Sequence, residues 1–185
     1  MCNFLTRNSK MKRKLIIFLF FHLFFNFSHG QTKENEDVYQ IISVVIESIN
    51  PAIPIVDTLN PISIPSKFLR KQIEEKISLN RKQKKILKKG DETETGILID
   101  RNELRQFKFY DNDSIITAFK NLDGKYDEYL HKKKPFYLIG KPLIFKESGI
   151  AILNVDLIVG FGAIYILKKE NGKWKVIGKV GKWYS

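Results

Sequence analysis

The apolar residues of this chain change their spacing near Pro142, from a helical repeat to alternation along the sequence. Before this point they recur three and four residues apart, as in amphipathic helices. After it, four segments predict strands, at 143–145, 150–159, 161–169 and 174–180. Asn171-Gly172 stands between the last two strands, and this dipeptide is the strongest short signal for a hairpin. The order predicts an α+β domain, with N-terminal helices packed on one face of a C-terminal antiparallel β-meander.

The helical half contains two clear helices and a connection rich in proline. One apolar stripe predicts a helix over 35–49, and Asn50-Pro51 ends it because the residue before a proline is pushed out of helical geometry. The connection that follows predicts a short edge strand at 53–57. Ser66 predicts the N-cap of the second helix. The expected buried stripe of this helix is Phe68, Leu69, Ile73 and Ile77. We further expect a strand at 97–99 and a helix in two pieces over 112–131.

The first thirty residues have the three parts of a secretory signal peptide. A basic start precedes the apolar run Leu15–Phe27, and Ser28-His29-Gly30 supplies small residues for cleavage before Gln31. The chain is therefore expected to be exported, to the periplasm or the medium, as a single domain of residues 31–185. An uncleaved N-terminal membrane anchor is the alternative, and Met11 is an alternative start. No other segment approaches the length of a membrane span.

Cleavage would remove most of the residues on which familiar catalytic sites depend. Cys2, His22 and His29 leave with the signal peptide, so His131 becomes the only imidazole. It lies beside three lysines and is read as an exposed bystander. Zinc sites of Cys and His ligands, and nucleophilic mechanisms that need a histidine base, are disfavoured. We expect no catalytic residues, no metal site and no cofactor, and an enzyme is the less favoured class.

The charge of the chain is strongly basic and comes mainly from lysine. The whole chain carries 32 basic and 20 acidic residues, and after cleavage 27 basic residues remain against 20 acidic ones, a net charge of +7. Lysine is the ordinary solvated surface cation, whereas arginine is preferred for bidentate phosphate recognition, so specific nucleic-acid binding is disfavoured. One helical piece concentrates the charge and could contact an anionic surface. Its basic residues are Arg81, Lys82, Lys84, Lys85, Lys88 and Lys89.

A polar pair interrupts one of the apolar strands. Asn154 and Asp156 are two residues apart and therefore share a face of the strand at 150–159. An acid and an amide in such a strand need hydrogen bonds, solvent or a concavity. Tyr165 on the next strand is a candidate partner. These three residues form the predicted pocket, and a wet sheet edge is the alternative reading.

The C-terminal segments carry a family resemblance. Ile150-Ala151-Ile152, Gly160-Phe161-Gly162, the run Asn171–Val176 (NGKWKV) and the closing Trp183-Tyr184-Ser185 resemble small uncharacterised secreted proteins of Gram-negative bacteria. That resemblance covers residues 140–185 best and implies no activity or site residues. Helices followed by a curved meander are also similar to the nuclear-transport-factor-2-like fold, which often holds a pocket.

These observations favour a non-catalytic binding module of the cell envelope. Its expected partner is an envelope protein or an anionic surface. The alternative is a small pocketed ligand-binding protein or enzyme that uses the carboxylate, amide and tyrosine side chains of the predicted pocket.

Overall fold

The computed structural model describes residues 35–61, 66–89, 96–115, 135–158 and 160–184, with the backbone alone for 182–184. The expected signal peptide, His131 and most of the helix expected over 112–131 lie outside these residues. The chain divides into two compact units, Met1–Asp37 and Val38–Ser185. The description below concerns the second unit.

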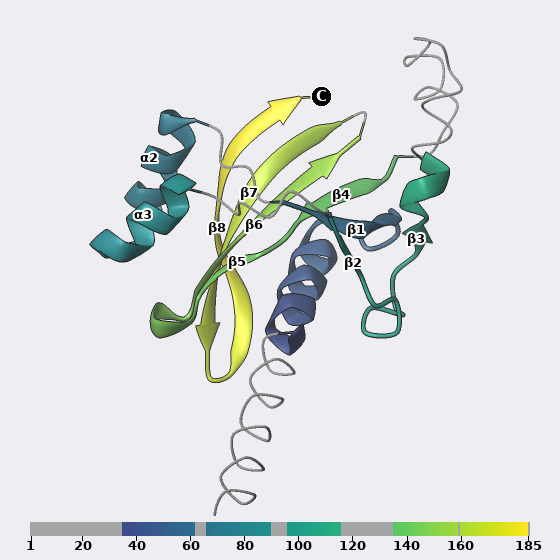
Figure 1. Cartoon of the computed structure of the whole chain (residues 1–185), viewed down its shortest axis with the longest axis horizontal. Coiled ribbons are helices and arrows are strands. Elements are labelled where there is room, and N and C mark those ends of the chain that lie inside the picture. Colours follow the sequence, from purple (N-terminus) through teal and green to yellow (C-terminus); the bar gives the residue numbers. More distant parts are fainter. Residues whose placement is uncertain (1–34, 62–65, 90–95, 116–134, 159, 185) are drawn as a thin grey trace, which may run out of the picture. The chain divides into compact units, whose positions relative to one another are not determined.

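The second unit is built on a mixed sheet whose strands are mainly antiparallel (Figure 1), which confirms the α+β class. The eight strands of this sheet among the described residues are β1 (Ile55–Asn60), β2 (Ile97–Leu98), β3 (Phe109–Tyr110), β4 (Tyr137–Gly140), β5 (Leu143–Phe145), β6 (Ile150–Leu157), β7 (Phe161–Glu170) and β8 (Lys173–Tyr184). The main strand order is β2-β1-β4-β6-β7-β8, with β3 paired to β1 and β5 paired to β6.

The C-terminal meander matches the sequence prediction closely. Strands β6, β7 and β8 pair antiparallel in succession. Asn171 and Gly172 join the last two strands with φ of 51° and 78°. Both values are positive, as the tight primed hairpin turn requires, and asparagine and glycine are the residues that adopt them most readily. The alternating half of the chain therefore folds as its local pattern predicts.

The other half of the sheet differs from the prediction. Strand β1 lies inside the sheet, because it pairs with β4 on one side and with β2 and β3 on the other. The strand predicted at 53–57 is present two to three residues further along the chain, at 55–60, but the prediction that it is an edge strand was wrong. Strand β4 was not predicted at all. It runs parallel to β1 and antiparallel to β6, and so joins the meander to the N-terminal half.

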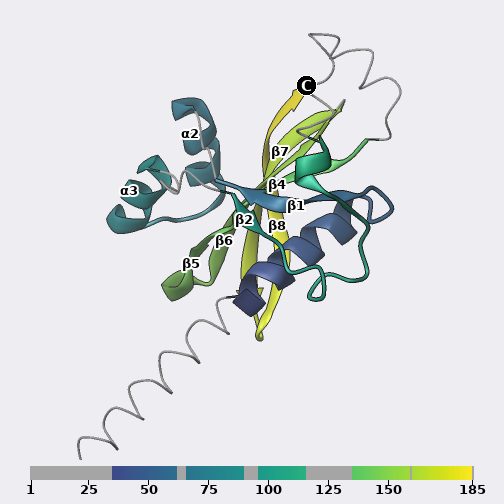
Figure 2. The same ribbon diagram turned by 45° about the vertical axis from the view of Figure 1, so that its right-hand side comes forward.

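Helices cover both faces of the sheet, and the prediction of helices on one face was wrong. The helix over 35–49 packs Ile41, Val45 and Ile46 on the face that carries Leu153 and Val155. Helices α2 (Lys67–Lys76) and α3 (Arg81–Lys89) pack on the opposite face, which carries Ile152, Ile164 and Ile166. Figure 2 shows α2 and α3 to the left of the sheet and the helix over 35–49 to its lower right.

Helices α2 and α3 begin at side-chain caps. The Ser66 hydroxyl accepts a hydrogen bond from the Leu69 amide at 3.1 Å, which confirms the predicted N-cap of α2. Ile73 and Ile77 are buried as expected, but Phe68 is 67% exposed and does not belong to the stripe. At the start of α3, Asn80 and Gln83 exchange two side-chain-to-amide bonds of 2.9 Å each. This reciprocal arrangement is a capping box.

Candidate functional site

The structure brings two of the three predicted pocket residues together on β6. The Asn154 amide nitrogen donates a hydrogen bond of 3.0 Å to the Asp156 carboxylate. Both side chains are partly buried, on the face that α2 and α3 cover elsewhere. Ile152 and Ile164 lie on one side of the pair, within the core under those helices, and Leu138 and Ile158 belong to a separate apolar cluster. The polar side chains of Asn154 and Asp156 therefore lie between two clusters of apolar side chains.

Two glycines on the neighbouring strands flank this pair. Gly162 on β7 lies opposite Asp156. Gly140 on β4 lies beside Asn154, so that an added Cβ would stand 3.3 Å from the Asn154 Cβ. Glycine inside a strand often marks a place where a ligand or another chain segment approaches the backbone closely. Neither glycine was predicted as part of the pocket, although Gly162 lies within the strand predicted at 161–169. Their positions inside apolar strands were the signal that could have identified them.

The Asn154 side chain has one unmet hydrogen-bonding group. Its carbonyl oxygen is buried and has no hydrogen-bond partner. An unpaired buried acceptor costs about 1–3 kcal/mol relative to a paired one. A hydrogen-bond donor on a ligand would remove this free-energy cost. Asn154 is therefore the residue of the pair that has an unused group for binding a ligand.

Tyr165 lies on the other face of the sheet and does not join Asn154 and Asp156. Its register partner on β6 is Leu153, and residues directly opposite in an antiparallel pair share a face. Tyr165 is 4% exposed, in the core under the helix over 35–49, together with Tyr137, which is 1% exposed. Neither hydroxyl has a hydrogen-bond partner. Burial raises the pKa of Tyr137 to about 12, and the nearby Tyr165 adds to the rise.

Helix α3 presents the predicted basic surface. Gln83 and Leu87 are its buried residues, and they fix which side of the helix faces the protein. All six predicted cations are exposed. The Lys84 ammonium forms an ion pair of 2.8 Å with Glu74 on α2, and Lys82 lies 4.0 Å from Glu147. The basic surface, defined as the six cations of α3, therefore lies on the side of the helix that faces away from the protein.

A groove of about 190 Å³ runs beside α3. Its floor is mainly apolar, from Ile86 on α3 and Ile144 and Phe145 on β5. Its rim is charged, with Lys82 on α3 and Lys146 and Glu147 on η1 (Lys146–Ser148). Gln83 is the remaining residue that lines the groove. Its side-chain amide nitrogen donates a 2.9 Å hydrogen bond to the Ser148 hydroxyl. That bond ties α3 to η1, which also lines the groove.

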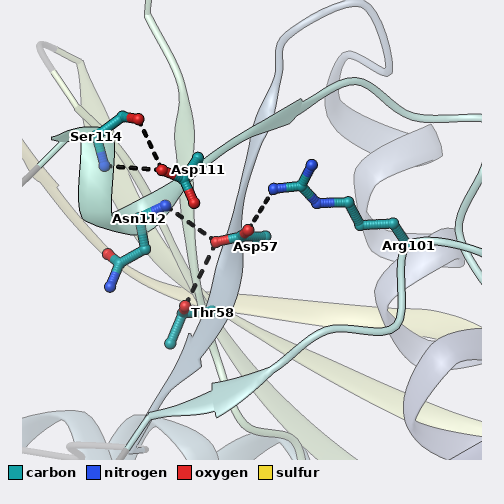
Figure 3. A network of polar contacts seen from close by, with 6 residues as sticks. All are labelled: Asp57, Thr58, Arg101, Asp111, Asn112 and Ser114. Atoms are coloured by element: carbon teal, nitrogen blue, oxygen red, sulfur yellow. Dashed lines mark hydrogen bonds and ion pairs between the residues drawn. The ribbon is translucent and has the colours of Figure 1, made fainter.

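A buried carboxylate organises the opposite end of the sheet (Figure 3). Asp57 on β1 is 3% exposed and accepts hydrogen bonds from the Arg101 guanidinium at 2.5 Å and the Asn112 amide at 3.0 Å. Asp111 caps the helical turn that starts at residue 112, and it accepts from the Ser114 hydroxyl and amide at 2.6 and 2.9 Å. These hydrogen bonds, that of the hydroxyl first, lower the pKa of Asp111. Because Asp57 is buried and joins two segments that are distant from it in sequence, at Arg101 and Asn112, we read the network as structural.

The described residues contain neither a candidate metal site nor a candidate membrane-spanning helix, and comparisons with known proteins assign no role to these surfaces. Within the described ranges, no group of three or more His, Cys, Asp and Glu side chains is placed to hold a metal ion. None of the helices in those ranges has the length and apolar character that a membrane span requires. Comparison of the chain with models of protein families, with curated proteins and with solved structures gave no match.

Proposed function

We propose that this protein is an exported, non-catalytic binding module that docks on anionic membrane surfaces through the basic surface of α3. The observation that carries the proposal is the fixed orientation of this helix. Gln83 and Leu87 are buried, and the capping box and the Gln83–Ser148 bond hold the helix start in place. All six cations of the nine-residue helix therefore face solvent together.

The ion pairs of α3 leave much of its charge available. Lys84 is paired with Glu74, and Lys82 is only 4.0 Å from the exposed Glu147. In the described part of the chain, Arg81, Lys85 and Lys88 form no ion pair. A basic residue close to an anionic membrane contributes about 1 kcal/mol to binding. Three such residues contribute about 3 kcal/mol together, a factor of roughly 150 in affinity for an anionic surface.

The chemistry of the cations favours a lipid surface over a nucleic acid. Five of the six are lysines, whose ammonium groups act as point charges and need no fixed partner geometry. A fluid layer of lipid phosphates offers charge without such geometry. Ile86 is the only apolar side chain of α3 that is exposed, at 36%, so docking would be electrostatic with little insertion.

The export part of the proposal rests on the sequence. The basic start, the apolar run Leu15–Phe27 and the small residues before Gln31 support transfer into the envelope, where anionic lipids are accessible. The alternative of an uncleaved anchor would hold α3 near the same membrane. The nuclear-transport-factor-2-like architecture stays a prediction.

Vesicle binding tests the docking proposal. The α3 variant carries Arg81→Glu, Lys85→Glu and Lys88→Glu, and a control variant carries the same charge change at the exposed Arg105, Lys108 and Lys173. Wild type and control should sediment with phosphatidylethanolamine vesicles that contain phosphatidylglycerol, and not with phosphatidylcholine vesicles. The α3 variant should bind at least about 100-fold more weakly.

Two results would reject docking on lipid. One is an equal loss of binding in the α3 and control variants, which would mean that only net charge matters. The other is failure of the wild type to bind anionic vesicles. A single envelope protein cross-linked through α3 in that second case would assign the surface to a protein partner instead.

A second candidate function rests on the buried, unpartnered carbonyl oxygen of Asn154. Under this alternative, a small ligand with a hydrogen-bond donor binds beside Gly140 and Gly162, where no side chain stands between it and the Asn154–Asp156 pair. A thermal-shift screen of polar metabolites would then give a stabilising compound, and Asp156→Ala would abolish its shift. Retention of the shift in Asp156→Ala, with vesicle binding unchanged, would exclude this site.

A further inference from the structure

The groove beside α3 combines an apolar floor with a charged rim, and docking of the basic surface on lipid does not require it. Ile86, Ile144 and Phe145 supply the floor, and Ile86 is 36% exposed although it is a large apolar side chain. The volume of about 190 Å³ equals roughly six water molecules at ~30 Å³ each. A complete drug-sized ligand needs at least about 300 Å³. The groove therefore fits a short hydrocarbon segment of a larger molecule.

The rim indicates what the rest of that molecule should be. Lys82 comes from α3 and Lys146 from η1, and Glu147 is the one acidic residue of the lining. The Lys82–Glu147 pair spans 4.0 Å with both side chains more than three-quarters exposed. Ion pairs of this kind contribute little to stability, so an incoming anion can replace Glu147 as the partner of Lys82. The lining thus matches an apolar tail with an anionic head.

The free energy of transferring the apolar tail into the groove favours the aqueous phase, rather than a bilayer, as the source of such a ligand. Moving a tail from the interior of a bilayer into an apolar groove exchanges one hydrocarbon environment for another and gains little. Moving it from water gains about fourfold in affinity for each methylene that becomes fully buried. We propose that the groove binds a single-chain anionic amphiphile from the aqueous phase, with its tail over Ile86, Ile144 and Phe145 and its head between Lys82 and Lys146.

Calorimetric titration with three compounds that differ in tail length or in head group tests the ligand class. Octyl phosphate, ethyl phosphate and octyl glucoside, each below its micellar concentration, separate the contributions of tail and charge. Octyl phosphate should bind at least about tenfold more tightly than either of the others, because each of them lacks one half of the recognised chemistry. Equal affinity for octyl phosphate and octyl glucoside would overturn the role of the head. Equal affinity for octyl and ethyl phosphate would overturn the role of the groove.

Point variants locate the site. Ile86→Ser should weaken octyl phosphate binding about fivefold, whereas Ile177→Ser should not, although Ile177 on β8 is 47% exposed and thus no less accessible. Lys82→Gln should weaken binding and Glu147→Gln should strengthen it, each by about threefold. Equal effects of the two isoleucine variants, or effects of Lys82→Gln and Glu147→Gln in the same direction, would contradict the assignment.

The α3 variant separates this proposal from docking on membranes. Its three substitutions, at Arg81, Lys85 and Lys88, are outside the lining of the groove. Octyl phosphate binding should therefore survive in the α3 variant within about threefold while vesicle binding is lost. Loss of both activities together would overturn a separate site in the groove.

Discussion

The Lys84 ammonium lies 2.8 Å from the Glu74 carboxylate and so joins α3 to α2. This contact divides the basic surface into residues with different roles. Lys84 is half exposed and its charge is balanced locally, whereas Lys85, the next residue, is exposed and has no ion-pair partner in the described part of the chain. Adjacent lysines of one helix are therefore expected to respond differently to substitution.

The first prediction compares these two lysines. Lys85→Gln should weaken binding to anionic vesicles about fivefold, the equivalent of about 1 kcal/mol, and leave the free energy of unfolding unchanged. Lys84→Gln should lower the free energy of unfolding by about 0.5 kcal/mol and weaken vesicle binding less than Lys85→Gln does. Vesicle sedimentation and urea titration measure the two quantities. The reverse order of the two variants in vesicle binding would count against the assigned roles.

The second prediction concerns the buried carboxylate of Asp57. Asp57→Ala should lower the free energy of unfolding by about 3 kcal/mol, because it leaves the Asn112 amide without its acceptor and the Arg101 guanidinium without its partner. Glu103→Ala, an exposed acid in the adjacent loop, should change it by less than about 0.5 kcal/mol. Urea unfolding of both variants measures the difference. Similar values for the two would show that the network in Figure 3 contributes little to stability.

The third prediction is a pH dependence at the Asp111 cap. The pKa of Asp111 is lowered from 3.8, chiefly by the Ser114 hydroxyl. A lowered folded-state pKa gives stability that is present above pH 3.8 and is lost as the pH falls through the folded value. Ser114→Ala should move the pKa of Asp111 back toward 3.8 and reduce the loss of stability in acid. Carboxyl titration by NMR measures this directly, and an unchanged pKa in Ser114→Ala would refute the stated cause.

The fourth prediction concerns alkaline stability. Burial raises the pKa of Tyr137 from 10.0 to about 12, so the folded protein favours the neutral phenol. The resulting stability is complete below pH 10 and is lost as the pH rises from there to about 12. Tyr137→Phe cannot ionise and should lose less stability than the wild type over this interval. At pH 7 the two proteins should agree within about 1 kcal/mol, since the hydroxyl has no partner. Parallel denaturation curves at alkaline pH would show that Tyr137 does not ionise on unfolding.

Much of the local structure could be predicted from the sequence. The helix over 35–49, α3, the Ser66 cap and the Asn171-Gly172 turn depend on neighbouring residues, and the structure confirms them. Strand β4 was missed because Phe136–Gly140 is a short apolar run without alternation, and its partner β1 is distant in sequence. Such a run between Pro135 and Pro142 is nevertheless typical of a strand buried on both faces.

The candidate site depended on register, which the sequence did not determine. Asn154 and Asp156 belong to one strand, so their shared face followed from alternation alone. Tyr165 belongs to the next strand, where a shift of one residue in the connection exchanges the two faces. Gly140 and Gly162 could not be assigned to the candidate site from the sequence, because only the strand pairing places them beside Asn154 and Asp156. The basic surface needed no such information, because one short helix contains all of it.

The most direct test of docking maps the protected lysines of the unmodified protein. The wild type is acetylated in the presence of phosphatidylglycerol-containing vesicles or of phosphatidylcholine vesicles, and each lysine is quantified by mass spectrometry. The docking proposal predicts that Lys85 and Lys88 are protected only by the anionic vesicles, while Lys108 and Lys173 react equally in both. Equal protection of all four lysines, or protection of Lys108 and Lys173 alone, would contradict docking through α3.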